Sequence, residues 1–117
     1  SQYRLPGTFC PIADFDLVKH AAEECEKLGV HFMVGNILSS DTFYDDANSG
    51  MEWAKMGVLG VEMESAALYC NAARAGKKAL CICTVSDSFV YPEENTTAEE
   101  RQTSFTKMME VALEIAE

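Results

Sequence analysis

Short apolar runs alternate with stretches of helical periodicity along this chain, and the alternation limits the folds that it can adopt. Three runs are apolar and partly β-branched, as buried strands are, and span residues 30–37, 58–63 and 78–85. Apolar residues recur at helical spacing in 14–29, about 50–56, 64–75 and from 97 to the end of the sequence. Alternating strands and helices predict an α/β fold with a mostly parallel sheet and helices on its faces.

Local residues predict where the helices begin and end. Asp14 can accept a hydrogen bond from the free amides that open a helix, and Gly29 can adopt the left-handed conformation that ends one. Gly76 is placed to end the third helix in the same way. Thr97 and Glu100 match the capping-box pattern that opens the last helix.

The chain is acidic, because 9 Lys and Arg stand against 19 Asp and Glu and give a net charge of -10. This charge repels phosphate backbones and anionic lipid headgroups, so we expect no nucleic-acid partner and no membrane partner. The length fits one domain, 1–117, and no apolar stretch approaches the ~18 residues that a membrane-spanning helix needs. A cytoplasmic location is expected.

The five cysteines are odd in number and lie mostly in apolar runs, which favours reduced, buried thiols in a cytoplasmic protein. Cys81 and Cys83 would share one face of a strand. Two thiols without further ligands make a poor metal site, so we expect them to fill the core and expect no metal. His20 and His31 have no acid or serine partner in motif spacing, which favours surface or packing roles.

Polar clusters follow each of the three predicted strands. They are residues 39–41 with Phe43 and Tyr44, residues 62–64, and Ser86 with Asp87. In open α/β sheets, ligands bind at the carboxyl ends of the strands, where these clusters would converge. Together they offer carboxylates, hydroxyls and aromatic faces. That combination suits a neutral sugar carrying a planar base better than it suits a phosphate or a metal.

Several segments resemble the nucleoside phosphorylase family in order and spacing. They are Val34-Gly35-Asn36 with Asp41-Thr42-Phe43-Tyr44, Gly60-Val61-Glu62-Met63-Glu64, and Thr84-Val85-Ser86-Asp87. The stretch 96–103 is similar to the purine-specific, hexameric bacterial branch of that family. The likeness covers nearly all of the chain. It implies the C-terminal half of a phosphorylase-type fold, a partial three-layer α/β domain with a mostly parallel central sheet flanked by helices.

The resemblance also implies roles for single residues. Glu64 would hold the ribose hydroxyls, and Met63 would pack under the sugar. Asp87 would be the general acid that protonates the purine N7, and Arg101 would swing toward it to help proton transfer. Phe43 would stack on the base. The predicted substrate-binding set is completed by Val61, Glu62 and Ser86.

Plainer roles stay open when the residues are considered without the resemblance. Glu64 could favour a helix N-terminus through the helix dipole, Asp87 could bond loop amides, and Arg101 could be a solvated helix charge. Met63 and Phe43 could be core residues. The competing functions are a nucleoside-binding domain without catalysis and a structural fragment without a ligand.

The branch of the family is also open to argument. Uridine phosphorylases share residues 40–44 and 62–66, so these segments do not select the base. Asp87 offers an acid for N7, which pyrimidines lack, and the loop after Tyr44 is too short for the pyrimidine-reading insertion. Nucleosidases of the methylthioadenosine type keep an acid at the position of Asp87, but the stretch 96–103 disfavours them.

The implied reaction is reversible phosphorolysis of purine ribonucleosides or deoxyribonucleosides, as in purine salvage. Its co-substrate is inorganic phosphate, and no cofactor is implied. The phosphate-binding glycine-rich turn, arginines and serine belong to the N-terminal half of the family, together with a histidine from a neighbouring subunit, and are not among these residues. We therefore expect the isolated chain to be inactive and prone to aggregate, and the intact enzyme to be a homo-hexamer built as a trimer of dimers.

Overall fold

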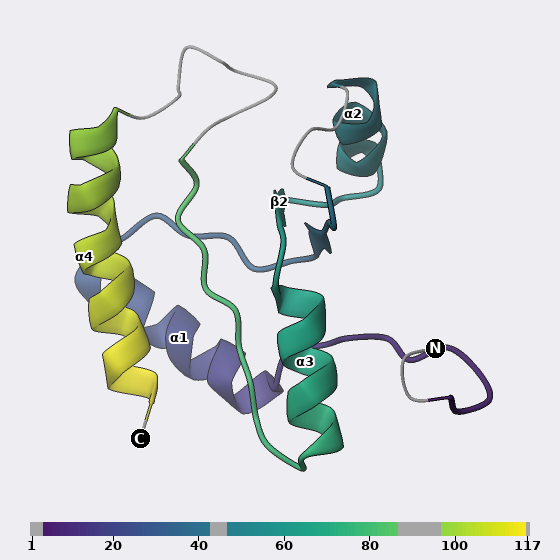
Figure 1. Ribbon diagram of the computed structural model, residues 1–117. Helices are drawn as coiled ribbons and strands as arrows, with labels where there is room; N and C mark the ends of the chain where they lie inside the picture. The colour runs from purple at the N-terminus through teal and green to yellow at the C-terminus, as the bar shows by residue number, and fades with distance from the viewer. Residues whose placement is uncertain (1–3, 43–46, 87–96, 117) are drawn as a thin grey trace.

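Residues 4–42, 47–86 and 97–116 are described in the computed structural model (Figure 1). Within that part, helices and strands alternate as the sequence predicts as far as α3, and α4 follows α3 without a strand between them. The elements are α1 (Phe15–Leu28), β1 (Ile37–Ser39), α2 (Ala47–Lys55), β2 (Gly60–Glu62), α3 (Ser65–Arg74) and α4 (Ala98–Ile115). The predicted helices are therefore present, and α2 begins a few residues earlier than its periodicity indicates. The fold agrees with a partial α/β domain of the phosphorylase type.

Helix α1 begins and ends at the residues that its sequence predicts. The Asp14 carboxylate accepts a hydrogen bond from the Leu17 amide at 3.1 Å, which satisfies one of the free N–H groups at the start of the helix. Gly29 has a φ of 67°, in the left-handed region, and its N–H donates to the carbonyls of Cys25 and Glu26. Both predicted caps of this helix are confirmed.

Strands β1 and β2 form a parallel pair, as predicted. Ile37 lies opposite Gly60, and Ser39 lies opposite Glu62. The ladder is prolonged at its carboxyl end because the Ser40 amide donates to the Glu62 carbonyl at 2.8 Å. The Leu59 side chain lies over Gly35 just before the ladder, since a Cβ added at Gly35 would lie 2.7 Å from the tip of that side chain, which would have to shift.

The predicted strand at 78–85 is wrong for this structure. The segment runs between α3 and α4 without strand pairing in the described part of the chain (Figure 1). Its backbone instead bonds to non-strand groups: the Ala79 carbonyl accepts from the Asp14 amide at 3.0 Å, and the Cys81 amide donates to the Tyr69 hydroxyl at 2.8 Å. An apolar run predicts burial, whereas a strand also needs a neighbouring strand to accept and donate hydrogen bonds.

The predicted strand at 30–37 is largely wrong, because it overlaps β1 only at Ile37, and the predicted strand at 58–63 is shortened to residues 60–62. Only the parts that face each other across the β1–β2 ladder are strand. The preceding residues 30–36 follow an irregular path from the end of α1.

A small core lies between α1 and α4. Its buried apolar residues in the described part of the chain are Ala21 from α1 and Val111 and Ile115 from α4. Leu80 and Ile82 of the extended segment pack against this cluster. No helix among the described residues is long and apolar enough to cross a membrane.

The prediction that the cysteines are buried is wrong. All are free thiols; Cys10 and Cys83 are exposed, and Cys25, Cys70 and Cys81 are half-buried. Leu80 and Ile82, beside Cys81 and Cys83, pack against the small core, whereas Phe9 and Ile12, beside Cys10, are 55% and 70% exposed. Core filling therefore does not describe Cys83.

Candidate functional site

The carboxyl ends of β1 and β2 lie side by side, and their polar residues form one cluster. Ser39 faces Glu62 across the parallel ladder, where its hydroxyl helps to lower the pKa of the Glu62 carboxyl. The Ser39 oxygen also accepts from the Ala66 amide at 3.3 Å, so it bridges the strand pair to α3. Two of the three predicted clusters, 39–41 and 62–64, are thus brought together.

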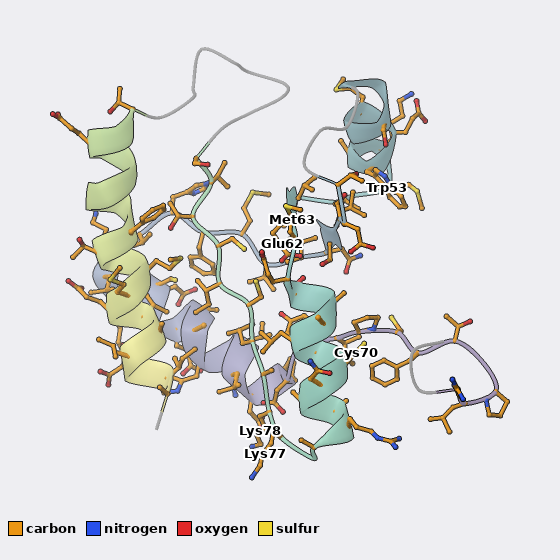
Figure 2. All side chains as sticks on the ribbon, in the orientation of Figure 1. Trp53, Glu62, Met63, Cys70, Lys77 and Lys78 are labelled. Carbon is orange, nitrogen blue, oxygen red and sulfur yellow. The ribbon has the colours of Figure 1, made fainter. Side chains whose placement is uncertain are left out.

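Glu62 holds the N-terminus of α3. One carboxylate oxygen accepts from the Glu64 amide at 2.6 Å and from the Ser65 amide at 2.7 Å, and the other accepts from the Ser65 hydroxyl. Ser65 is buried, with 4% of its surface exposed. Figure 2 shows Glu62 and Met63 where β2 leads into α3. The Glu62 carboxylate is therefore occupied by hydrogen bonds at the N-terminus of α3. Its predicted contact with a substrate stays a prediction.

The protonation of Glu62 follows from these contacts. Partial burial raises the pKa of its carboxyl, but the hydrogen bonds from the Ser65 hydroxyl, the Glu64 and Ser65 amides and the Ser39 hydroxyl outweigh it. The net pKa is lowered, so Glu62 is an anion at neutral pH. An anion at a helix N-terminus is further favoured by the helix dipole.

Glu64 stands at the N-cap position of α3 without capping it. Its φ and ψ are -126° and -19°, and its side chain makes no capping hydrogen bond. The side chain is exposed, and in the described part of the chain no hydrogen bond engages its carboxylate. The amides that it could have accepted from are bonded to Glu62. Glu64 therefore presents an unengaged carboxylate beside the strand ends.

Apolar side chains flank this carboxylate. Val61 is 47% exposed and Met63 is 40% exposed, although both are large and hydrophobic. Successive residues of a strand point to opposite faces, so Val61 and Glu62 lie on different sides of β2. Exposed apolar surface next to a carboxylate suits a ligand with both hydroxyls and an apolar face.

The turn after β1 is held by its own hydrogen bonds. The Ser40 hydroxyl accepts from the Thr42 amide at 3.2 Å and donates to the Thr42 carbonyl at 2.9 Å. Asp41 is exposed in this turn. Phe43, which follows it, lies outside the described residues, so its predicted stacking on a base stays a prediction.

The third predicted cluster follows the extended segment. The pKa of the Cys81 thiol is raised to about 12, first by burial, then by the neighbouring Cys83 thiol, and then by the charges of Glu62 and Glu64. The charges of the cluster therefore reach this segment. Ser86 is half-buried where the described segment ends.

Of the two predicted catalytic residues, only the backbone of Arg101 lies in the described part of the chain. Asp87 lies outside the described residues. Arg101 lies in the first turns of α4, as predicted, and the contacts of its side chain lie outside what the structure describes. The predicted meeting of Asp87 with Glu64 thus stays a prediction.

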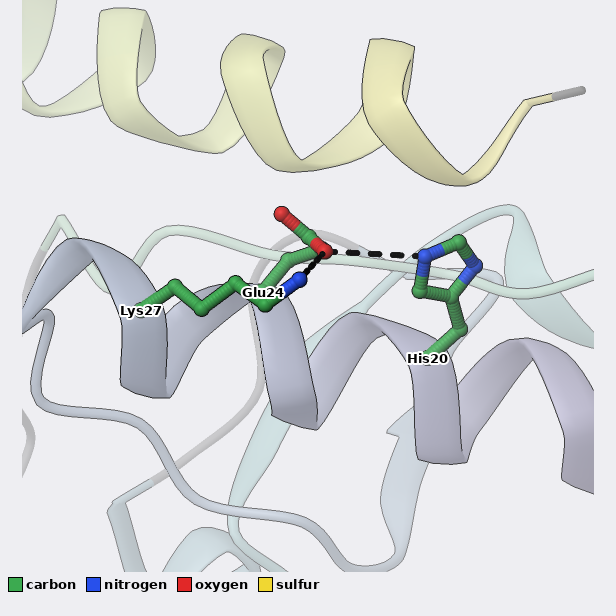
Figure 3. A network of polar contacts seen from close by, with 3 residues as sticks. All are labelled: His20, Glu24 and Lys27. Atoms are coloured by element: carbon green, nitrogen blue, oxygen red, sulfur yellow. Dashed lines mark hydrogen bonds and ion pairs between the residues drawn. The ribbon is translucent and has the colours of Figure 1, made fainter.

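The histidines lie away from the cluster. His20 is on α1, with its ring nitrogen 3.6 Å from a Glu24 carboxylate oxygen that also binds Lys27 at 3.0 Å (Figure 3). His31 is exposed after the end of α1. Among residues 4–42, 47–86 and 97–116, no three His, Cys, Asp or Glu side chains gather as a metal site would need.

The family of this chain follows from comparison with known proteins. A model of the Phosphorylase superfamily matches residues 1–117. This chain belongs to the phosphorylase superfamily. The motifs that carried the resemblance all lie within the match, so the predicted family is confirmed.

Curated members of the phosphorylase superfamily are similar over most of the chain. The DeoD-type purine nucleoside phosphorylases of Clostridium novyi (strain NT) and Thermoanaerobacter sp. (strain X514) are 56% and 54% identical over 110 residues, which are 93% of this chain and 47% of each relative. That of Bacillus subtilis (strain 168) is 53% identical over 105 residues, 90% of this chain and 45% of the relative. The chain spans about half the length of these relatives and matches their C-terminal half.

The candidate site also contains residues to which the sequence analysis gave no role of their own. The Ser65 hydroxyl donates to the Glu62 carboxylate, and Ser39 lies opposite Glu62 in the ladder. Glu62 in turn accepts a hydrogen bond from the amide of Glu64. Ser65 directly follows Glu64, so its position was a usable signal. Ser39 belongs to the predicted cluster 39–41, but its place opposite Glu62 could not be predicted, because that place depends on strand register.

Proposed function

We propose that this chain forms the nucleoside-binding side of a purine nucleoside phosphorylase that works in purine salvage in the cytoplasm. The relatives that cover most of the chain carry that enzyme name. The observation that carries the proposal is the unengaged Glu64 carboxylate beside the strand ends, with Glu62 occupied in holding α3. The site has the groups that a sugar with vicinal hydroxyls requires.

The proposed reaction exchanges one bond to the sugar for another. A phosphate oxygen attacks the anomeric carbon, the bond from that carbon to purine N9 breaks, and its electron pair moves onto the base. Asp87 donates a proton to N7, so the base leaves neutral, and the other product is the sugar 1-phosphate. A positioned general acid contributes roughly 100-fold to 10,000-fold in rate.

Glu64 is the proposed sugar ligand. A carboxylate can accept hydrogen bonds from two adjacent hydroxyls, and charge-assisted bonds of this kind are the stronger ones. Glu62 acts as a positioning residue, because it bonds the Glu64 amide. Met63 and Val61 supply apolar surface around the sugar.

The base and the proton are assigned to the remaining predicted residues. Phe43 stacks on the base, and Ser86 lies next to the acid Asp87. Arg101 assists proton transfer when the site closes. Purines are favoured over pyrimidines because only a purine has an N7 to receive the proton.

Phosphate is bound by groups outside these residues in this proposal. The net charge of -10 disfavours an anion, and the relatives are about twice as long as this chain. The other half of the phosphorylase domain supplies the phosphate site, and the assembled enzyme is a hexamer. Inorganic phosphate is a co-substrate, and no cofactor takes part.

A chimera tests the proposal. The first half of the Bacillus subtilis relative, joined to this chain, is expected to cleave inosine in a phosphate-dependent reaction, whereas the chain alone is expected not to. Replacing Glu64→Gln in the chimera should lower kcat/KM by roughly 10-fold to 100-fold, since a hydrogen bond to a charged group is worth about 1.5–3 kcal/mol. The exposed Glu110→Gln change on α4 is the matched control and should have no effect.

Asp87→Ala separates catalysis from binding. The proposal expects a large fall in kcat with inosine affinity nearly unchanged, measured by steady-state kinetics and by titration. An unmodified chimera that binds inosine but never cleaves it would show a binding module instead. Full activity of the Glu64→Gln chimera would contradict the proposal that the Glu64 carboxylate binds the sugar.

A further inference from the structure

Two thiols that the proposed reaction does not use lie in contact on the extended segment. The Sγ atoms of Cys81 and Cys83 are 3.5 Å apart. Both are free, Cys83 is exposed and Cys81 is half-buried. They are therefore a pair of neighbouring thiols of which one is open to small molecules in solution.

The backbone between them needs only a small change to bring the sulfurs into bonding distance. In an extended chain, residues two apart have Cα atoms about 6.6–7.2 Å apart, and disulfides join Cα atoms about 4.4–6.8 Å apart. The Ala79 carbonyl accepts a hydrogen bond from the Asp14 amide, and the Cys81 amide donates one to the Tyr69 hydroxyl; both groups lie at or before the first cysteine. In the described part of the chain no ladder bond between 81 and 83 has to break.

We propose that Cys81 and Cys83 are a modification site that takes a low-molecular-weight disulfide and becomes an intramolecular disulfide that reversibly inactivates the enzyme. The Cys83 thiolate attacks one sulfur of the small disulfide, and a mixed disulfide forms as one small thiol leaves. Cys81, after losing its proton to solvent, attacks the Cys83 sulfur and releases the second small thiol. Two protein thiols are oxidised, and one small disulfide is reduced to two thiols.

The environment sets the order of these steps. The exposed Cys83 meets the small disulfide first, since Cys81 is partly covered and lies near the negative charges of Glu62 and Glu64. The raised pKa of Cys81 owes part of its shift to the Cys83 thiol itself. Once Cys83 is in the mixed disulfide, its thiol no longer raises the pKa of Cys81, whereas burial, the largest cause, still does.

The inactivation rests on the proposed function. The Cys81 amide is anchored to Tyr69 on α3, so contraction between the cysteines draws Thr84 and Ser86 toward that anchor. Thr84 also contacts the Met108 sulfur on α4 at 3.3 Å, and this contact would have to shift. Displacing catalytic groups by about 1 Å can cost about 100-fold in rate, and Asp87 directly follows this segment.

Mass spectrometry tests the modification without reference to activity. The chain is treated with oxidised glutathione, alkylated with iodoacetamide and digested with trypsin. Residues 79–101 then form one peptide that contains both Cys81 and Cys83 and no other cysteine. The expected result is a peptide lighter by two hydrogens that resists alkylation until dithiothreitol is added. Alkylation of both thiols, or a lasting glutathione adduct on Cys83, would overturn the proposal.

Activity tests the consequence in the inosine-cleaving chimera. Oxidation should lower kcat/KM at least ~10-fold, dithiothreitol should restore it, and Cys83→Ser should abolish the sensitivity while Cys10→Ser should keep it. An equal fall in kcat/KM on oxidation of the Cys83→Ser chimera would overturn the proposal that the disulfide inactivates the enzyme. If the reduced chimera never cleaves inosine, the proposed function fails, and the modification site is then decided by the peptide mass alone.

Discussion

At the scale of single residues, two glutamates separated by one methionine take different tasks. Glu62 accepts hydrogen bonds from the amides of Glu64 and Ser65, whereas Glu64 accepts none in the described part of the chain. The difference arises because the chain turns from β2 into α3 between them, which aims the amides back at Glu62. One carboxylate builds the turn, and the other is left for a ligand.

The hydrogen bonds of Glu62 predict a pH-dependent contribution to stability. Its pKa in the folded protein lies below the ordinary value of 4.5, so its stabilisation is present above that value and is lost as the pH falls through the folded-state pKa. Glu62→Gln should therefore lower the free energy of unfolding by about 1–3 kcal/mol at pH 7 and by progressively less in acid. Urea unfolding followed by circular dichroism across pH 3 to 7 (~4 units spanning the ordinary carboxyl pKa) measures this.

Glu110→Gln is the control for the same titration, because Glu110 is an exposed glutamate on α4. Its unfolding free energy should follow the wild type at every pH. A Glu62→Gln deficit that stays constant down to the most acid point would mean that ionisation of Glu62 does not stabilise the fold.

At the scale of elements, the pairing of α1 with α4 supplies the buried apolar contacts. Ile115 is 8% exposed and Val111 is 3% exposed, and they pack with Ala21 of α1. Burial on one face of α4 leaves its other face open, since Leu113 is 75% exposed. The helix is thus held to the rest of the chain by one stripe of residues.

Ile115→Ala should lower the free energy of unfolding by about 2–5 kcal/mol, because a buried side chain is removed and a cavity is left. Leu113→Ala, on the same helix and of similar size, should change it by less than about 0.5 kcal/mol. Chemical denaturation of both variants provides the comparison. Equal effects of the two substitutions would show that α4 does not pack on α1 through this face.

At the scale of the whole molecule, the chain exposes far more surface than a compact protein of its mass. Its accessible surface is 9222 Å², against about 6300 Å² expected for a folded monomer of 12.9 kDa. Its radius of gyration is 15.5 Å, against about 13.4 Å expected for a compact domain of this length. Much apolar surface is included, and an apolar groove between α1, α3 and α4 is lined by Leu17, Leu68, Leu80, Met108 and Ile115.

This surface predicts that the chain alone self-associates and binds hydrophobic dyes. Large exposed apolar patches mark surfaces that associate with other protein. The fluorescence of anilinonaphthalene sulfonate should rise on adding the isolated chain, and sedimentation should detect species larger than 12.9 kDa. The chimera with the first half of the Bacillus subtilis relative should bind less dye per mole. If the chain sediments as a monomer and does not raise the fluorescence of the dye, the expectation of aggregation is contradicted.

The sequence by itself determined the features that depend on neighbours along the chain. The ends of α1 were predictable because Asp14 and Gly29 act through hydrogen bonds to residues three or four positions away. The parallel α/β class followed from alternating patterns, and the family followed from motifs that the superfamily match contains. Glu64 was predicted as the sugar ligand because it lies in one of these motifs.

Only the tertiary structure decided the features that depend on partners distant in sequence. The run at 78–85 is apolar, yet it is not a strand, because no strand in the described part of the chain lies beside it to complete its hydrogen bonds. Ser39 joins the site, and Glu62 leaves Glu64 free, because strand register and the β2–α3 turn set which donors reach which carboxylate. Contacts of this kind are absent from local pattern, since they exist only after the chain has brought separate segments together.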